Sequence, residues 1–163
     1  LEDGGVGIML VDSPALGAAV KTWLRSGSDE VYFTATGDDA LRFERTVSGT
    51  TSTATIGYSG ASLAAGDMVV AWRWTPGIGG LERLDEDEFP EEIPPYTLDL
   101  WVRQGGVTAR ATSVVATEGF NGDLWPMSDE GTTHLGGAFK WGRVWRTLLT
   151  DAEVAAEMEA LLP

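Results

Sequence analysis

The residues of this sequence that are best suited to binding chemistry lie close together, in residues 119–126. This segment holds the only asparagine of the chain, Asn121, with the carboxylate of Asp123 and the indole of Trp125. An amide and a carboxylate can hydrogen-bond the hydroxyl groups of a sugar while an aromatic face stacks on its ring. The segment therefore predicts a glycan-binding loop. The alternative is a structural one, in which Asn121 and Gly122 form a tight turn and Trp125 closes one end of the core.

Carboxylates are concentrated in residues 85–88, where acid–base catalysis is the chemistry to consider. Glycoside hydrolysis needs two carboxyl groups held at a fixed separation across the scissile bond. From Asp85 to Glu92, however, no aliphatic residue separates the acidic ones, so nothing there forms a desolvated pocket that would shift their pKa values. Residues 76–95, rich in proline and glycine, therefore predict an exposed acidic surface loop. Weak cation binding is the remaining interpretation.

Nucleophilic and metal chemistry are limited by a single histidine, His134, and by the absence of cysteine. No Gly-x-Ser-x-Gly motif is present, and a transition-metal site needs more His or Cys ligands than this chain offers. Disulfides and thiol catalysis are excluded as well. Calcium held by Asp123 with Asp38 or Asp39 is one hypothesis, although their spacing matches no defined calcium loop. The sequence therefore predicts a protein that is not an enzyme and has no required cofactor.

The charge balance restricts the partners of the chain. Eleven basic against 25 acidic residues give a formal net charge of −14, which repels phosphate backbones and anionic lipids. Neither nucleic acid nor a membrane is expected as a partner. The 163 residues predict one domain, 1–163. Because the chain begins at Leu1 without a secretory signal, we expect a processed product or a fragment.

The elements that must position these residues are short strands separated by small and polar residues. Residues 68–74 alternate between an aromatic face, which includes Trp72 and Trp74, and a second face. Residues 98–103 alternate in the same way and predict a half-buried strand on which Trp101 is exposed. Further strands are predicted at residues 8–11, 31–34, 41–44, 53–58, 107–115 and 139–145. Gln104-Gly105-Gly106 predicts a hairpin turn.

One helix is expected, over residues 150–162. Thr150 and Glu153 have the spacing of a capping box, and Val154, Met158 and Leu161 follow at helical intervals. Residues 15–24 are open to two interpretations, a helical stretch or an edge strand. A chain of alternating strands with one terminal helix excludes a doubly wound sheet and favours an all-β, antiparallel two-sheet sandwich.

The C-terminal third carries a resemblance to a known family. A glycine pair, Gly136-Gly137, precedes Phe139, then the strand containing Gly142-Arg143, then the helix start at Thr150. This order resembles the closing segment of laminin G-like domains in the concanavalin A-like lectin/glucanase superfamily. Residues 68–74 and the hairpin after residues 98–102 are similar to central elements of that family. The resemblance implies a jelly-roll sandwich, found in adhesins, glycan-binding modules and bacteriophage structural proteins. The Glu-x-Asp-x-Glu strand of the family's glucanases is missing here.

Seven tryptophans exceed what the core of a domain of this size requires, so we expect exposed indoles at Trp101 and Trp141. With Asn121, Asp123 and Trp125 they are the candidate glycan-binding residues. The preferred function is a surface-displayed binding module, on a bacteriophage virion or outside the cell, that recognises a glycan or a host receptor. The alternative is a structural virion protein, such as a capsid decoration, spike or tail subunit, with protein partners in a homo-oligomer or larger assembly. A glucanase-like hydrolase is the third hypothesis.

Overall fold

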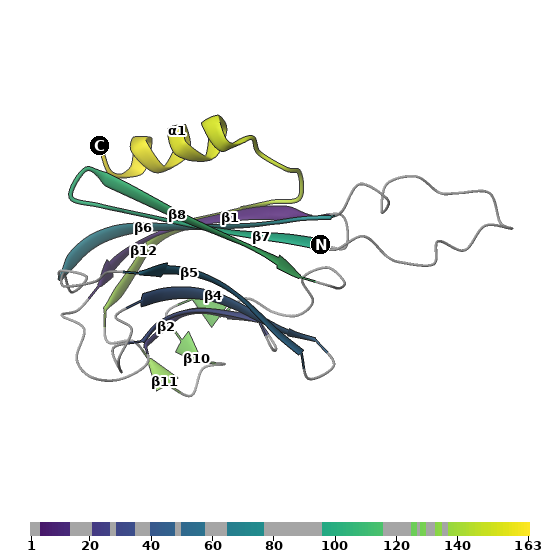
Figure 1. The fold of residues 1–163 in the computed structure, drawn as a ribbon. Coiled ribbons are helices and arrows are strands. Elements are labelled where there is room, and N and C mark those ends of the chain that lie inside the picture. Colours follow the sequence, from purple (N-terminus) through teal and green to yellow (C-terminus); the bar gives the residue numbers. More distant parts are fainter. Residues whose placement is uncertain are drawn as a thin grey trace, which may run out of the picture.

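The computed structural model describes residues 4–13, 21–26, 29–34, 40–47, 50–57, 65–76, 96–115, 125–126, 128–129, 133–134 and 137–163. Within these ranges the chain is mostly β-structure, with one helix at the C-terminal end (Figure 1). No helix in the described ranges has the length and hydropathy needed to cross a membrane.

Five strands form one antiparallel sheet. They are β1 (Gly5–Ser13), β6 (Gly66–Thr75), β7 (Tyr96–Gln104), β8 (Val107–Val115) and β12 (Ala138–Trp145). Their order in the sheet is β12-β1-β6-β7-β8. These bounds confirm the strands predicted at residues 8–11, 68–74, 98–103, 107–115 and 139–145. The residues form strands because their β-branched and aromatic side chains suit a pleated surface.

The turn between β7 and β8 is the one that the sequence predicts. Gln104 pairs with Val107, and the two residues between them, Gly105 and Gly106, have φ values of 59° and 77°. A two-residue hairpin loop of this kind needs positive φ at both central positions, which glycine adopts without steric cost.

Both faces of the sheet centre are buried. The face that points away from the helix is apolar and comprises Met68, Val70, Trp72, Trp74, Leu98 and Leu100. On the opposite face Ala71 is fully buried and Trp101 is 5% exposed. The prediction of a half-buried strand at residues 98–103 is therefore wrong, because a helix covers the face that the alternation assigned to solvent.

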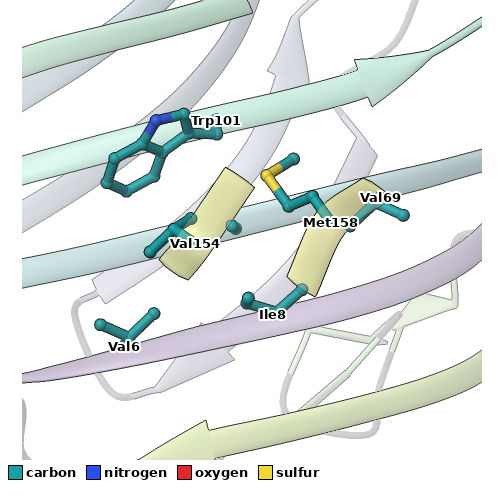
Figure 2. Close-up of a cluster of buried hydrophobic side chains, with 7 residues drawn as sticks. Val6, Ile8, Val69, Trp101, Val154 and Met158 are labelled. Carbon is teal, nitrogen blue, oxygen red and sulfur yellow. The ribbon is translucent and has the colours of Figure 1, made fainter. Parts of the chain in front are cut away.

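That helix is α1 (Asp151–Leu161), which begins after the N-cap Thr150. The capping box with Glu153 is confirmed, and α1 lies on one face of the sheet (Figure 1). Val154 and Met158 are fully buried. They form one apolar cluster with side chains from β1, β6 and β7: Val6, Ile8, Val69, Ala71 and Trp101 (Figure 2).

The glycines of β1 make room for tryptophans of β6. A Cβ atom on Gly7 would lie 2.1 Å from Cζ2 of Trp72, and one on Gly5 would lie 3.0 Å from Trp74. The Trp72 indole therefore lies directly on the backbone of β1, a position that any larger residue at 7 would obstruct.

A further set of strands pairs in the order β5-β4-β3-β2-β9. They are β2 (Lys21–Ser26), β3 (Asp29–Thr34), β4 (Ala40–Val47), β5 (Thr50–Gly57) and β9 (Trp125–Pro126). Strands β10 (Ser128–Asp129) and β11 (Thr133–His134) form a short pair. These bounds confirm the strands predicted at residues 31–34 and 41–44, and β5 matches the one predicted at 53–58 up to Gly57. Of residues 15–24, the part from Lys21 is a strand, and residues 14–20 lie outside the described ranges.

Candidate functional site

Trp101, one of the predicted ligand-binding residues, lies beneath α1. In the register of the sheet it stands between Ala71 of β6 and Arg110 of β8. The guanidinium carbons of Arg73 and Arg110 lie 5.0 Å and 4.9 Å from the centroid of its ring. The prediction that Trp101 is exposed is therefore wrong. Because α1 and two arginines cover its indole, it cannot stack on a sugar.

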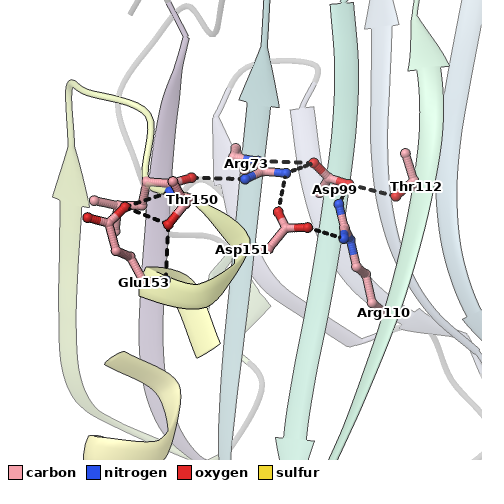
Figure 3. Close-up of polar contacts among 8 residues, drawn as sticks. Arg73, Asp99, Arg110, Thr112, Thr150, Asp151 and Glu153 are labelled. Carbon is pink, nitrogen blue, oxygen red and sulfur yellow. Dashed lines mark hydrogen bonds and ion pairs between the residues drawn. The ribbon is translucent and has the colours of Figure 1, made fainter. Parts of the chain in front are cut away.

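Beside Trp101, a buried carboxylate organises a charged network (Figure 3). Asp99 is 1% exposed, and its Oδ2 accepts hydrogen bonds from Nε of Arg73 at 3.0 Å and from Nη2 at 2.7 Å. Its Oδ1 accepts from Nη2 of Arg110 at 2.8 Å and from the hydroxyl of Thr112 at 2.6 Å. Four hydrogen bonds from three side chains satisfy this anion, so Asp99 acts as a counter-ion that fixes the two arginines.

The same two arginines hold the first turn of α1. Asp151 accepts from Nη2 of Arg73 at 2.8 Å and from Nη1 of Arg110 at 2.6 Å, while Nη1 of Arg73 donates to the carbonyl of Leu149 at 2.9 Å. Desolvation acts to raise the pKa of Asp151, but hydrogen bonds from both arginines outweigh it and lower that pKa. Desolvation likewise acts to lower the pKa of Arg110, and its bonds to Asp99 and Asp151 raise it.

Further contacts fix both ends of the helix. The backbone N–H of Thr150 donates to Glu153 at 2.7 Å, and the N–H of Glu153 donates to the Thr150 hydroxyl at 3.3 Å. The backbone hydrogen bond, with a second one from the Thr150 hydroxyl, lowers the pKa of Glu153. At the other end, Nε of Arg103 donates to the carbonyl of Leu162 at 2.7 Å. We call the side chains of Arg73, Asp99, Arg110 and Asp151 the helix clamp, since they join α1 to the sheet.

The second predicted exposed indole, Trp141, lies on β12, one of the two outermost strands of the described five-stranded sheet. It is half-buried and packs against the cluster beneath α1. Around it the surface is open: Phe139 is 46%, Val144 37% and Leu148 41% exposed. Arg143 lies over the ring of Trp145, 4.9 Å from its centroid. Exposed apolar and basic side chains therefore both occur in this strand and the residues after it, 138–148, which we call the β12 edge.

The candidate glycan-binding residues are not brought together where the structure describes them. Trp101 and Trp141 are on β7 and β12, which are separated by β1 and β6. The backbone of Trp125 belongs to β9 and pairs with β2. Asn121 and Asp123 lie outside the described residues, so their arrangement with Trp125 stays a prediction.

Of the other sequence candidates, His134 alone has its backbone within the described ranges. His134 lies on β11, paired with Ser128 of β10. Residues 85–88, Asp38 and Asp39 lie outside the described residues. Among those that are described, no group of three His, Cys, Asp or Glu side chains could hold a metal ion.

Sequence reasoning missed the helix clamp, although a signal for it exists. Arg73 shares a strand face with Val69 and Ala71, and Asp99 shares one with Trp101. Opposite charges that lie next to buried apolar residues on two strands indicate a buried ion pair. Only the register, in which Arg73 stands opposite Asp99, shows that the two side chains meet.

Comparison with known proteins adds no relative to this description. No family model matches the chain, and neither the curated proteins nor the solved structures give a match. The resemblance to laminin G-like domains therefore stays a prediction from the sequence.

Proposed function

We propose that this chain is a non-catalytic binding module that associates with a protein partner. The observation that carries the proposal is the exposure of three apolar side chains, Phe139, Val144 and Leu148, within the β12 edge. Apolar side chains that lie together on a surface mark interaction sites. This observation favours the structural alternative, with protein partners, over glycan recognition, because Trp101 is covered by α1.

The proposed setting is the surface of a particle or an extracellular surface, with a bacteriophage virion preferred. The resemblance of residues 134–154 to laminin G-like domains supports this setting. The net charge of −14 supports it too, because a strongly charged surface limits nonspecific association where chains are displayed at high density.

The fold proposed with this function is the two-sheet jelly roll. The strands from β5 to β9 would form its second layer, covering the face of the first sheet that points away from α1. On β6 and β7 that face consists of buried apolar side chains and needs a cover, and Ala54 of β5 is itself 1% exposed. An Ala54→Glu substitution tests the stacking. We expect the melting temperature to fall by more than about 5 °C, because a buried charge has no partner there; an unchanged value would contradict the stacking.

The proposed function is tested by photo-crosslinking from the β12 edge. A photoreactive amino acid replaces Val144 in one variant and the exposed Glu159 of α1 in a control. We expect the variant with the photoreactive residue at position 144 to crosslink to a protein partner, and the variant at position 159 to form no such crosslink. A glycan array and a β-glucan hydrolysis assay run alongside. Glycan binding that is lost in Trp125→Ala or Asp123→Ala would return the site to residues 119–126, and released reducing sugar would overturn the non-catalytic assignment.

A further inference from the structure

The β12 edge combines three features that occur together where one strand pairs with another. The first is its place in the sheet: in the part of the chain that the structure describes, β12 pairs with β1 and has no neighbour on its other side. An outermost strand presents unpaired N–H and C=O groups to which a further strand can add. All eight of its residues are exposed or half-buried, so its outer side is accessible.

The second feature is that only one end of this strand is protected. The register with β1 shifts between Leu10 and Val11, which leaves Lys140 unmatched in a bulge. A bulge and a lysine both discourage pairing at a sheet edge. From Trp141, opposite Leu10, to Trp145, opposite Val6, the register is regular. Residues 141–145 are therefore the part of the edge that remains competent to pair.

The third feature is the local charge. Residues 131–150 contain no Asp or Glu in a chain with 25 of them, and they contain Lys140, Arg143 and Arg146. Lys140 forms an ion pair with Asp67. Arg143 lies over Trp145 and has no carboxylate partner among the described residues. The pairing-competent part of the edge is thus a cationic site on an acidic protein.

We propose that residues 141–145 accept an added β-strand from an acidic protein partner, which places a carboxylate near Arg143 and apolar side chains near Val144. This inference rests on the proposed function and deepens it by naming the chemistry of the partner. Opposite charges on neighbouring strands stabilise pairing, and like charges oppose it.

A second copy of this chain is a poorer occupant. Antiparallel self-pairing centred on Arg143 would put two arginines opposite each other, and any other centre still gathers the cations of both copies on one edge without a carboxylate. The net charge of −14 on each copy adds repulsion between the two bodies.

The test uses the full chain, labelled with ¹⁵N, and two blocked peptides as probes. One is Thr-Val-Glu-Val-Asp-Val-Thr, and the other, Thr-Val-Lys-Val-Arg-Val-Thr, reverses its charges. We expect the acidic peptide to shift the amide signals of β12 and to bind at least about fivefold more tightly than the basic one. Arg143→Glu should reverse this preference. Arg146→Glu makes the same charge change beyond the strand and should leave the preference within about twofold.

Three results would overturn the inference. They are equal binding of both peptides, signal shifts outside β12, and self-association of the free chain through β12 in sedimentation analysis, which would assign the edge to a second copy. If neither peptide binds while position 144 still crosslinks to a protein, the added acidic strand is wrong and the proposed function stands. If position 144 crosslinks to no protein, the proposed function itself fails.

Discussion

The two sides of strand β1 differ in whether their apolar side chains are covered and their charged side chains are paired. On the β6 side, apolar side chains lie beneath α1, and the charges near them are paired: Arg73 with Asp99 and Asp151. On the β12 side, Phe139 and Val144 are exposed, and Arg143 lacks a carboxylate partner among the described residues. The first region is complete within one chain, whereas the second has apolar, cationic and backbone groups that a partner can satisfy.

This difference shows why alternation within a strand does not by itself identify an exposed tryptophan. Trp101 and Trp141 both alternate with core residues in their strands, yet α1 and two arginines cover the first. The second lies on the outermost strand, where its neighbours remain accessible. The position of a strand in the sheet, rather than the residue type, separates a buried indole from one whose neighbours are exposed.

The largest expected effect comes from removing the buried anion of the helix clamp. Asp99→Ala leaves Arg73, whose side chain is 12% exposed, without its main partner, and breaking a buried pair in this way costs about 3–5 kcal/mol. Asp67→Ala, on β6, removes the partner of Lys140 at the β12 edge, an anion that is 40% exposed, and should leave the urea midpoint unchanged. Equal losses in the two variants would mean that the clamp is not buried in solution.

The next effect concerns the apolar side chains of the two regions. Met158→Ala removes a fully buried side chain from beneath α1 and should lower the free energy of unfolding by about 2–5 kcal/mol. Leu148→Ala removes one that is 41% exposed and should change it by less than about 0.5 kcal/mol. Urea unfolding of the two variants measures both values. If Met158→Ala is as stable as Leu148→Ala, α1 is not docked on the sheet.

Periodicity in the sequence predicts the local part of this organisation, namely which face of a strand a residue lies on and where the helix begins. Alternation in residues 68–74 correctly assigned Trp72 and Trp74 to one face, and the spacing of Thr150 and Glu153 correctly gave the start of α1. Both patterns are local. What covers each face depends on contacts between distant segments, so the burial of Trp101 beneath α1 was missed.

The candidate site shows the same limit. Strand order is not encoded locally, so nothing in residues 138–145 alone indicates that β12 is the outermost strand. The sequence favoured Asn121, Asp123 and Trp125 on residue type, and the structure leaves the first two outside its described residues. Predicting the helix clamp requires the register between β6 and β7, and the spacing of residues within one strand does not reveal that register.

Substitutions at two glycines should change stability less, and they should again differ between an enclosed position and an exposed one. Gly7→Ala would place a Cβ 2.1 Å from Trp72, which is 2% exposed and enclosed, so we expect a loss of about 1–3 kcal/mol. Gly142→Ala would meet the ring of Phe139 at 2.7 Å, but that ring is 46% exposed and can rotate away. Thermal unfolding should therefore separate the two variants. Similar melting temperatures would contradict the difference in packing.

The smallest effect is the pH dependence of the clamp. The pKa of Asp151 is lowered in the folded chain, so its stabilising contribution is complete well above 3.8 and is lost as pH falls below that value. Because the side chain is 55% exposed, we expect under about 1 kcal/mol. The difference in stability between the parent chain and Asp151→Asn should shrink as pH falls from 6 to 3. A difference that stays constant would show that Asp151 is not held by the arginines.

Hydrogen–deuterium exchange of the full chain, with and without the acidic peptide, tests the β12 edge as a binding surface most directly. In the free chain, the amides of β12 should exchange faster than those of β6, because among the described strands β12 has a neighbour on one side only. The peptide should slow exchange in β12 and leave α1 and β6 unchanged. Exchange in β12 that is already as slow as in β6, or protection of α1 by the peptide, would contradict the assignment of the β12 edge as the binding surface.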